Sequence, residues 1–123
     1  MTNLPASRTA LLRQMYEAFN AQDLDALIPA ALAPDVNWPN LLDHTRAHGH
    51  EEVRAYWARQ FAVTHPLVRL EALRPDPDGH RIIATVLPGL RDESGDHWSE
   101  SPVEHVYTFG DDGKVRRMDV RTP

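Results

Sequence analysis

The residues best suited to acid–base chemistry lie near the end of the chain, in the segment 103–109. His105 and Tyr107 stand two positions apart, in a run where apolar or aromatic residues alternate with polar ones. This alternation predicts a strand and places both residues on its buried face. An imidazole in a partly apolar site can act as a general acid or base near neutral pH, and a phenol can donate a hydrogen bond to a ligand oxygen. Simple packing in the core is the alternative for both residues.

A hairpin is expected to position this strand. The tetrapeptide Gly-Asp-Asp-Gly at 110–113 separates two β-rich segments and is typical of a tight turn. A two-residue turn at its centre places His105 opposite Met118 and Tyr107 opposite Arg116. The two aspartates superficially resemble a calcium loop, but the other ligand positions of such a loop are missing.

A second acid–base candidate is the pair Asp43 and His44 in the loop 40–50. A carboxylate next to an imidazole could activate water, although residues on a loop are often simply solvated. Two further histidines, at 48 and 50, also suggest a metal site. The glycine between them argues against a rigid helical scaffold for zinc, so neither a metal nor another cofactor is expected.

A pocket is needed for these groups to act on a ligand, and apolar or aromatic residues are expected to line it. The expected lining residues are Tyr16, Phe19, Trp38, Trp57, Phe61, Met118 and Val120. They form a ligand site only if the core retains a void, because large aromatic side chains can either line a cavity or fill it. The expected ligand is a small hydrophobic molecule.

The elements that must position these residues follow from the apolar spacing. Helices are predicted over 8–20, with Ser7 as the cap, over 24–32, with Asp23 as the cap, and over 50–65. Strands are predicted over 36–39, 68–74, 81–87, 103–109 and 114–120, with a polar loop at 40–48 and a turn at 75–79. This order predicts one α+β domain over residues 1–123, in which helices cover one face of a curved sheet.

The composition narrows the class of function. With 18 acidic and 13 basic residues the net charge is −5, which argues against a nucleic-acid surface. The start of the chain lacks the pattern of a signal peptide, and no stretch has the apolar length of a membrane span. Because there is no cysteine, thiolate chemistry and disulfides are excluded, and a cytoplasmic location is expected.

The order of elements and the segments 16–25, 35–39, 49–57 and 109–119 resemble the SnoaL-like branch of the nuclear transport factor two-like (ketosteroid isomerase-like) superfamily. The resemblance spans nearly the whole chain. It implies a cone-shaped α+β barrel, in which three N-terminal helices pack in the concave face of a strongly curved, mainly antiparallel sheet and an apolar pocket opens at one end. It also implies a homodimer through the outer sheet face. Members include ketosteroid isomerases, polyketide cyclases, epoxide hydrolases, dehydratases and pocket proteins without established activity.

The ketosteroid isomerases allow a comparison residue by residue, because their site uses a base, a phenol donor and a protonated acid. By the resemblance, Trp38 stands where those enzymes have the base. Met15 stands where they have the phenol, with Tyr16 one step away in a different helix direction. The acid position falls on His105 or on Glu104, and the strand alternation favours His105. Steroid isomerase activity is therefore not expected.

Two functions are left open. One is a cofactor-independent isomerase, cyclase, dehydratase or hydrolase acting on a hydrophobic substrate, with His105 as acid or base and with Tyr107 or the Asp43 and His44 pair assisting. The other is a ligand-binding or dimerisation module without catalysis. A homodimer is expected for both, because the outer face of the last strands, with Val106, Val115 and alternating charges, suits a sheet-to-sheet contact.

Overall fold

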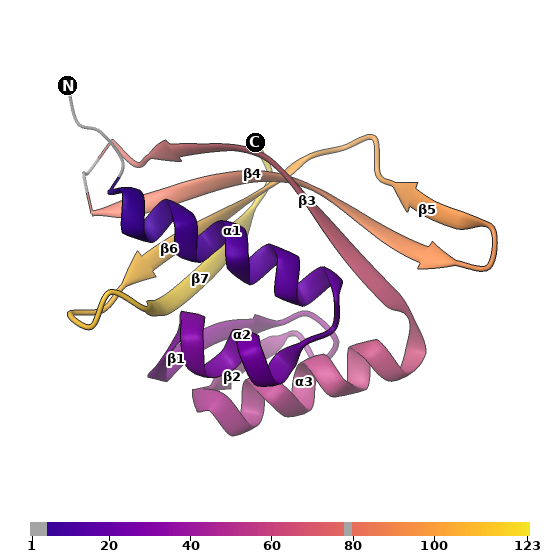
Figure 1. The fold of residues 1–123 in the computed structure, drawn as a ribbon, viewed down its shortest axis with the longest axis horizontal. Coiled ribbons are helices and arrows are strands. Elements are labelled where there is room, and N and C mark those ends of the chain that lie inside the picture. Colours follow the sequence, from indigo (N-terminus) through magenta and orange to yellow (C-terminus); the bar gives the residue numbers. More distant parts are fainter. Residues whose placement is uncertain (1–4, 78–79) are drawn as a thin grey trace.

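The computed structural model describes residues 5–77 and 80–123 and, within them, contains three helices and one curled, unclosed sheet of seven strands (Figure 1). The helices are α1 (Ala6–Asn20), α2 (Leu24–Ala31) and α3 (Gly49–Val63). The strands are β1 (Leu32–Asn40), β2 (Thr45–His48), β3 (His65–Pro75), β4 (Arg81–Asp92), β5 (Gly95–Trp98), β6 (Val103–Phe109) and β7 (Val115–Arg121). This architecture confirms the expected α+β fold. The start of the chain and part of the predicted 75–79 turn lie outside the described residues.

The sheet has the order β2-β1-β7-β6-β4-β3, and β5 pairs with β4. Only the β1–β7 pair is parallel among the described strands. In Figure 1 the three helices lie inside the curve of the sheet, with α1 nearest to β3 and with α3 beside β1 and β2. No helix within the described ranges is long and apolar enough to cross a membrane.

Two short strands depart from the predicted arrangement. The predicted polar loop contains β2, which pairs with the end of β1, and the turn after β4 continues into β5. Both strands are four residues long and mostly polar or exposed. Their backbone hydrogen bonds to a neighbouring strand stabilise them, and such pairing leaves no clear apolar pattern in a short sequence.

Of the two predicted helix N-caps, the cap of α2 is confirmed and the cap of α1 is wrong. Asp23 caps α2 as predicted, because its side chain accepts a hydrogen bond from the Ala26 N–H at 3.2 Å. Ser7 lies inside α1, and Pro5 takes the cap position instead, so the prediction of a Ser7 cap is wrong. A proline is well suited to the start of a helix, where the N–H that it lacks would have no partner in any case.

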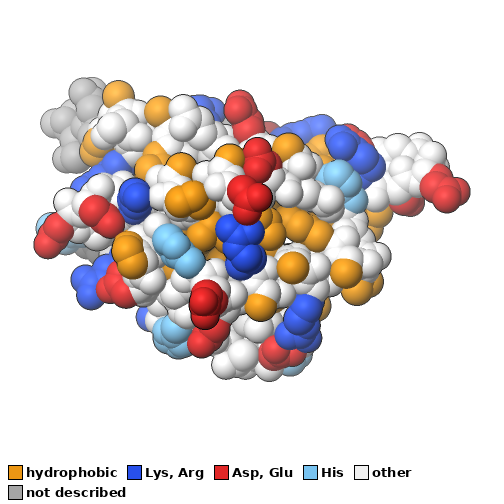
Figure 2. All heavy atoms as spheres, turned by 60° about the horizontal axis from the view of Figure 1, so that its bottom comes forward, with side chains coloured by type: hydrophobic (Ala, Val, Ile, Leu, Met, Phe, Trp, Pro, Cys, Tyr) orange, Lys and Arg blue, Asp and Glu red, His pale blue; other side chains and the backbone are white. Residues whose placement is uncertain are grey.

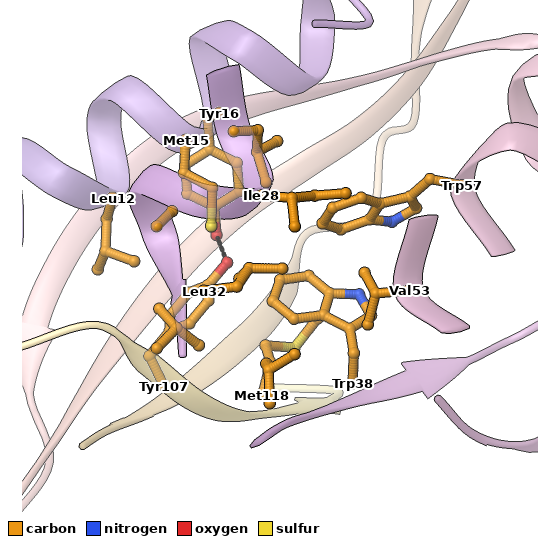
Figure 3. Packing of buried hydrophobic residues seen from close by; sticks show 14 of the residues in the cluster. Leu12, Met15, Tyr16, Ile28, Leu32, Trp38, Val53, Trp57, Tyr107 and Met118 are labelled. Atoms are coloured by element: carbon orange, nitrogen blue, oxygen red, sulfur yellow. Dashed lines mark hydrogen bonds between the residues drawn. The ribbon is translucent and has the colours of Figure 1, made fainter. Parts of the chain in front are cut away.

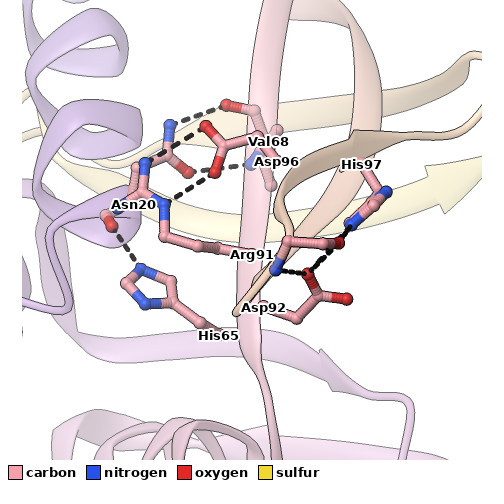
Figure 4. A network of polar contacts seen from close by, with 8 residues as sticks. Asn20, His65, Val68, Arg91, Asp92, Asp96 and His97 are labelled. Atoms are coloured by element: carbon pink, nitrogen blue, oxygen red, sulfur yellow. Dashed lines mark hydrogen bonds and ion pairs between the residues drawn. The ribbon is translucent and has the colours of Figure 1, made fainter.

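The C-terminal end of α1 is attached to β3 through Asn20 (Figure 4). The Asn20 side chain donates to the Val68 carbonyl at 2.9 Å and accepts from the Val68 N–H at 2.8 Å. His65 adds a bond from its Nε2 to the Asn20 carbonyl at 2.9 Å. These contacts hold the end of α1 against the sheet and so limit the rotation of the helix about its axis.

The β6–β7 hairpin has a different register from the predicted one. His105 lies opposite Val120 and Tyr107 opposite Met118, a shift of two residues from the prediction. Because side chains alternate with a period of two, an even shift keeps His105 and Tyr107 on the predicted inner face. The longer turn, in which the Gly110 N–H donates to the Lys114 carbonyl at 2.9 Å, accounts for one residue of this shift, and a bulge between Thr108 and Phe109 accounts for the other.

A bulge beside this turn places Val115 on the opposite face of the sheet from the predicted one. The ladder is irregular between Thr108 and Phe109, and Phe109 then pairs with Val115. An extra residue in one strand reverses the alternation beyond it. Val115 is consequently fully buried in the core, so its predicted place on the outer face is wrong.

The core gathers aromatic side chains from helices and strands that are distant in sequence (Figure 3). Trp57 of α3 and Trp38 of β1 meet edge to face, with ring centroids 5.1 Å apart and planes inclined by 78°. Trp38 also contacts Tyr107 of β6 at 6.2 Å between centroids. These rings pack α3 against the inner face of the sheet.

Candidate functional site

A cavity of about 300 Å³ lies between α1, α3 and the inner face of the sheet. Its lining is mainly apolar and aromatic, and within the described residues it includes no Asp, Glu, Lys or Arg. In the view of Figure 2, hydrophobic side chains lie across the middle of the face, with charged side chains among and around them. A mostly apolar hollow of this size with a few polar groups is typical of a small-molecule site.

The structure places most of the predicted lining residues around this cavity. They are Tyr16, Phe19, Trp38, Trp57, Met118 and Val120. Phe61 differs from the prediction: it is not in the lining and packs instead on the Phe19 ring, with centroids 5.3 Å apart. Two further lining residues were not predicted from the sequence: Tyr56 and Gln60, which lie one helical turn apart on α3.

The polar wall of the cavity is a cluster of Tyr16, Tyr107 and His105, called here the Tyr–Tyr–His cluster. Tyr16 Oη lies 2.5 Å from Tyr107 Oη and 2.9 Å from His105 Nδ1. His105 and Tyr107 are the two residues predicted to face inward together from β6. Tyr16, which was expected to contribute only apolar surface and to point in a different direction, brings its hydroxyl from α1 into the centre of the cluster.

Burial keeps the cluster uncharged at neutral pH. It lowers the pKa of His105 from 6.5 to about 4, because the apolar surroundings disfavour the imidazolium ion. The same loss of hydration raises the pKa of Tyr16 and of Tyr107 above the usual tyrosine range. The cluster therefore consists of two phenols and a neutral imidazole.

Both phenol hydrogens of the cluster have an acceptor only if His105 Nδ1 accepts a hydrogen bond, either from Tyr16 at 2.9 Å or from Tyr107 at 3.5 Å. If Tyr107 donates to Tyr16 and Tyr16 donates to His105 Nδ1, each phenol hydrogen has an acceptor. If His105 donates from Nδ1, one phenol hydrogen has no acceptor among the described residues, which is costly in a buried site. The favoured arrangement places the imidazole hydrogen on Nε2, which hydrogen-bonds no described residue. His105 can therefore donate a hydrogen bond to a ligand.

Asp43 and His44, both within the range 5–77, do not join this cluster. Asp43 accepts two hydrogen bonds from the Arg59 guanidinium, at 2.9 and 3.1 Å, and these lower the pKa of its carboxyl group. His44 lies in the exposed turn between β1 and β2, at a φ of 55°. Neither residue lines the cavity, but their neighbour Leu41 does.

Two of the histidines that suggested a metal site have other hydrogen-bond partners. His50 Nε2 donates to the Leu32 carbonyl at 2.9 Å, and the His48 N–H donates to the Glu52 carboxylate at 2.9 Å. Within residues 5–77 and 80–123, no group of three or more His, Asp or Glu side chains is placed to hold a metal ion.

Comparison with known proteins gives a family match and several structural matches. The sequence profile of the SnoaL-like domain matches residues 12–118. Among curated proteins, none matches the chain significantly.

Three solved structures illustrate the similarity in fold. An NTF2-like protein of unknown function from Burkholderia pseudomallei has a TM-score of 0.75 and 24% identity, covering 97% of this chain and 92% of its own. A protein from Mycobacterium tuberculosis, solved with estradiol-17beta-hemisuccinate, has a TM-score of 0.75 and 18% identity, covering 94% and 93%. A putative polyketide cyclase from Sinorhizobium meliloti has a TM-score of 0.73 and 17% identity, covering 96% and 95%.

Proposed function

The chain belongs to the SnoaL-like domain family, and from this premise we propose that its cavity binds a small, uncharged, mostly apolar molecule and holds one ligand oxygen against His105. The membership confirms the resemblance noted in the sequence. The observation that carries the proposal is the Tyr–Tyr–His cluster at the wall of an otherwise apolar cavity. The steroid derivative in the Mycobacterium tuberculosis structure supports a hydrophobic ligand.

The proposed chemistry is cofactor-independent proton transfer next to a carbonyl group, as in an isomerisation, cyclisation or dehydration. His105 would donate from Nε2 to the carbonyl oxygen and stabilise the negative charge that develops when a solvent water molecule takes a proton from the neighbouring carbon. A neutral imidazole is suited to this role, because its hydrogen bond strengthens as the oxygen becomes an enolate. Tyr16, donating to Nδ1, would hold the imidazole in the required tautomer.

A direct test is the exchange of the α-protons of 2-tetralone, a bicyclic ketone of suitable size, in deuterated water. The wild-type protein is expected to accelerate this exchange, and His105→Leu is expected to lower the acceleration by about 100-fold, the typical effect of removing one oxyanion donor. Exchange is followed by proton NMR.

The control for this test is His44→Leu, which removes a histidine outside the cavity and should leave the exchange rate unchanged. Full acceleration by His105→Leu would overturn the assignment of His105. Equal losses in both variants would also contradict it, since only His105 lies in the lining.

A second candidate function is ligand binding without catalysis. It is favoured by the described lining, which contains no carboxylate or lysine that could serve as a second acid–base group. In this case 2-tetralone should raise the thermal unfolding midpoint of the protein, because it binds only the folded chain. The α-protons of 2-tetralone should then exchange no faster with the protein than in buffer alone.

A homodimer through the outer sheet face and a cytoplasmic location stay predictions. On that face Val106 is already buried, and the Glu104 carboxylate accepts hydrogen bonds from Arg74 and Arg121. Sedimentation equilibrium should give a mass of two chains. A mass of one chain would contradict the dimer.

A further inference from the structure

A second pair of polar side chains lines the cavity from α3. Tyr56 and Gln60 lie one turn apart on the helix face that also carries Trp57, and all three belong to the lining. Side chains four residues apart on a helix project in the same direction. In Figure 1, α3 lies well apart from β6, which supplies His105 and Tyr107. Tyr56 and Gln60 therefore form a polar region of the cavity separate from the Tyr–Tyr–His cluster.

The Tyr56 hydroxyl has an unused donor. Its oxygen accepts a weak hydrogen bond from the Leu41 N–H at 3.4 Å, and within the described chain its own hydrogen has no acceptor. Burial raises the pKa of Tyr56, so the phenol stays protonated at neutral pH. The O–H group is thus available to an oxygen of a ligand.

The Gln60 side chain has more unused capacity. Its backbone carbonyl accepts from the Thr64 N–H at 3.1 Å, but its side-chain amide hydrogen-bonds no residue that the structure describes. An amide has two donor hydrogens and an acceptor oxygen. It therefore pairs with either a ketone or a hydroxyl group, and leaving it unpaired beside an apolar ligand would cost binding energy.

We propose that Tyr56 and Gln60 form a second polar subsite, so that the cavity selects molecules with a hydrogen-bonding oxygen at each end of an apolar body. The inference rests on the proposed function, in which the first oxygen lies against His105. The absence of charged side chains from the described lining indicates that both oxygens belong to uncharged groups, such as ketones or hydroxyls. Gln60 is then a residue that determines specificity and does not take part in the chemistry.

Two naphthols of nearly equal size test the subsite. 2-Naphthol carries one hydroxyl group, whereas 2,6-dihydroxynaphthalene carries one at each end. The wild-type protein is expected to bind the diol roughly three- to tenfold more tightly, the effect of one additional net hydrogen bond. In Gln60→Leu, which removes the amide but keeps the Tyr56 hydroxyl, this preference should fall roughly threefold, while the affinity for 2-naphthol stays within about twofold of wild type. Dissociation constants are measured by titration of naphthol fluorescence.

The control variant is Gln14→Leu, which makes the same change at an exposed position of α1 outside the cavity and should keep the preference for the diol. Retained affinity for 2-naphthol shows that a variant still has its cavity. A wild-type protein that binds both naphthols equally, or a Gln60→Leu variant that keeps the full preference, overturns the second subsite and leaves the proposed function standing. Failure of the wild-type protein to bind either naphthol overturns both proposals.

Discussion

Trp57→Ala is expected to lower the free energy of unfolding by about 3–5 kcal/mol, the usual cost of removing a large aromatic side chain from a core. Trp57 is 2% exposed, and its ring meets Trp38 at 5.1 Å and Phe19 at 5.8 Å between centroids. Its loss would remove its own ring contacts with Trp38 of β1 and Phe19 of α1 and would enlarge the cavity. Urea unfolding at neutral pH measures the difference.

The matched control is Trp98→Ala in β5. Trp98 is partly exposed, and the Arg69 guanidinium lies 4.2 Å from its ring centroid. A cation–π contact at such a site contributes only about 0.5–1 kcal/mol, so the control should lose much less stability. Similar losses for the two variants would contradict the central place of Trp57 in the core.

Acidification is expected to destabilise the wild-type protein by roughly 3 kcal/mol more than it destabilises His105→Gln, between pH 7 and pH 4. Burial lowers the pKa of His105 to about 4, while in the unfolded chain the same side chain titrates near 6.5. Between these two values the unfolded chain binds a proton that the folded chain does not. The stability from His105 is therefore fully present above pH 6.5 and is lost as the pH falls toward 4, at about 1.4 kcal/mol for each pH unit.

Urea titrations at several pH values give this difference directly. Other groups also titrate in acid: the ion pairs with Arg74 and Arg121 lower the pKa of Glu104. Their effect is common to both proteins and cancels in the comparison. His44→Gln, which removes an exposed histidine, should follow the wild-type profile. Parallel profiles for wild type and His105→Gln would show that His105 is not held neutral by its surroundings.

The strand faces could be predicted from the sequence, but the strand register could not. The alternation in 103–109 places His105 and Tyr107 on one face through local geometry alone. Register depends on the number of residues in the turn and on bulges, and here both a longer turn and a bulge at Thr108 and Phe109 intervene. The predicted inner face of His105 and Tyr107 is correct because the resulting register shift is even. Val115 lies beyond the bulge and faces the core, opposite to the prediction.

The composition of the cavity was also only partly predictable. Large aromatic residues at helical or strand spacing, such as Trp38 and Trp57, indicate an inner surface without indicating whether it is filled. Whether a void remains depends on how rings from α1, α3 and the sheet meet. Phe61 illustrates this dependence, because its ring packs on Phe19, a lining residue, but does not itself line the cavity.

By itself, the sequence determined the α+β fold, the inward direction of His105 and Tyr107, and the absence of thiol chemistry, because these depend on composition and local periodicity. Only the tertiary structure decided that Tyr16 joins His105 and Tyr107, from which it is separated by 89 and 91 residues. The direction of the Tyr16 hydroxyl depends on the rotation of α1 about its axis. Contacts at the end of the helix, including those between Asn20 and Val68, restrain that rotation, and no local pattern in the sequence encodes them.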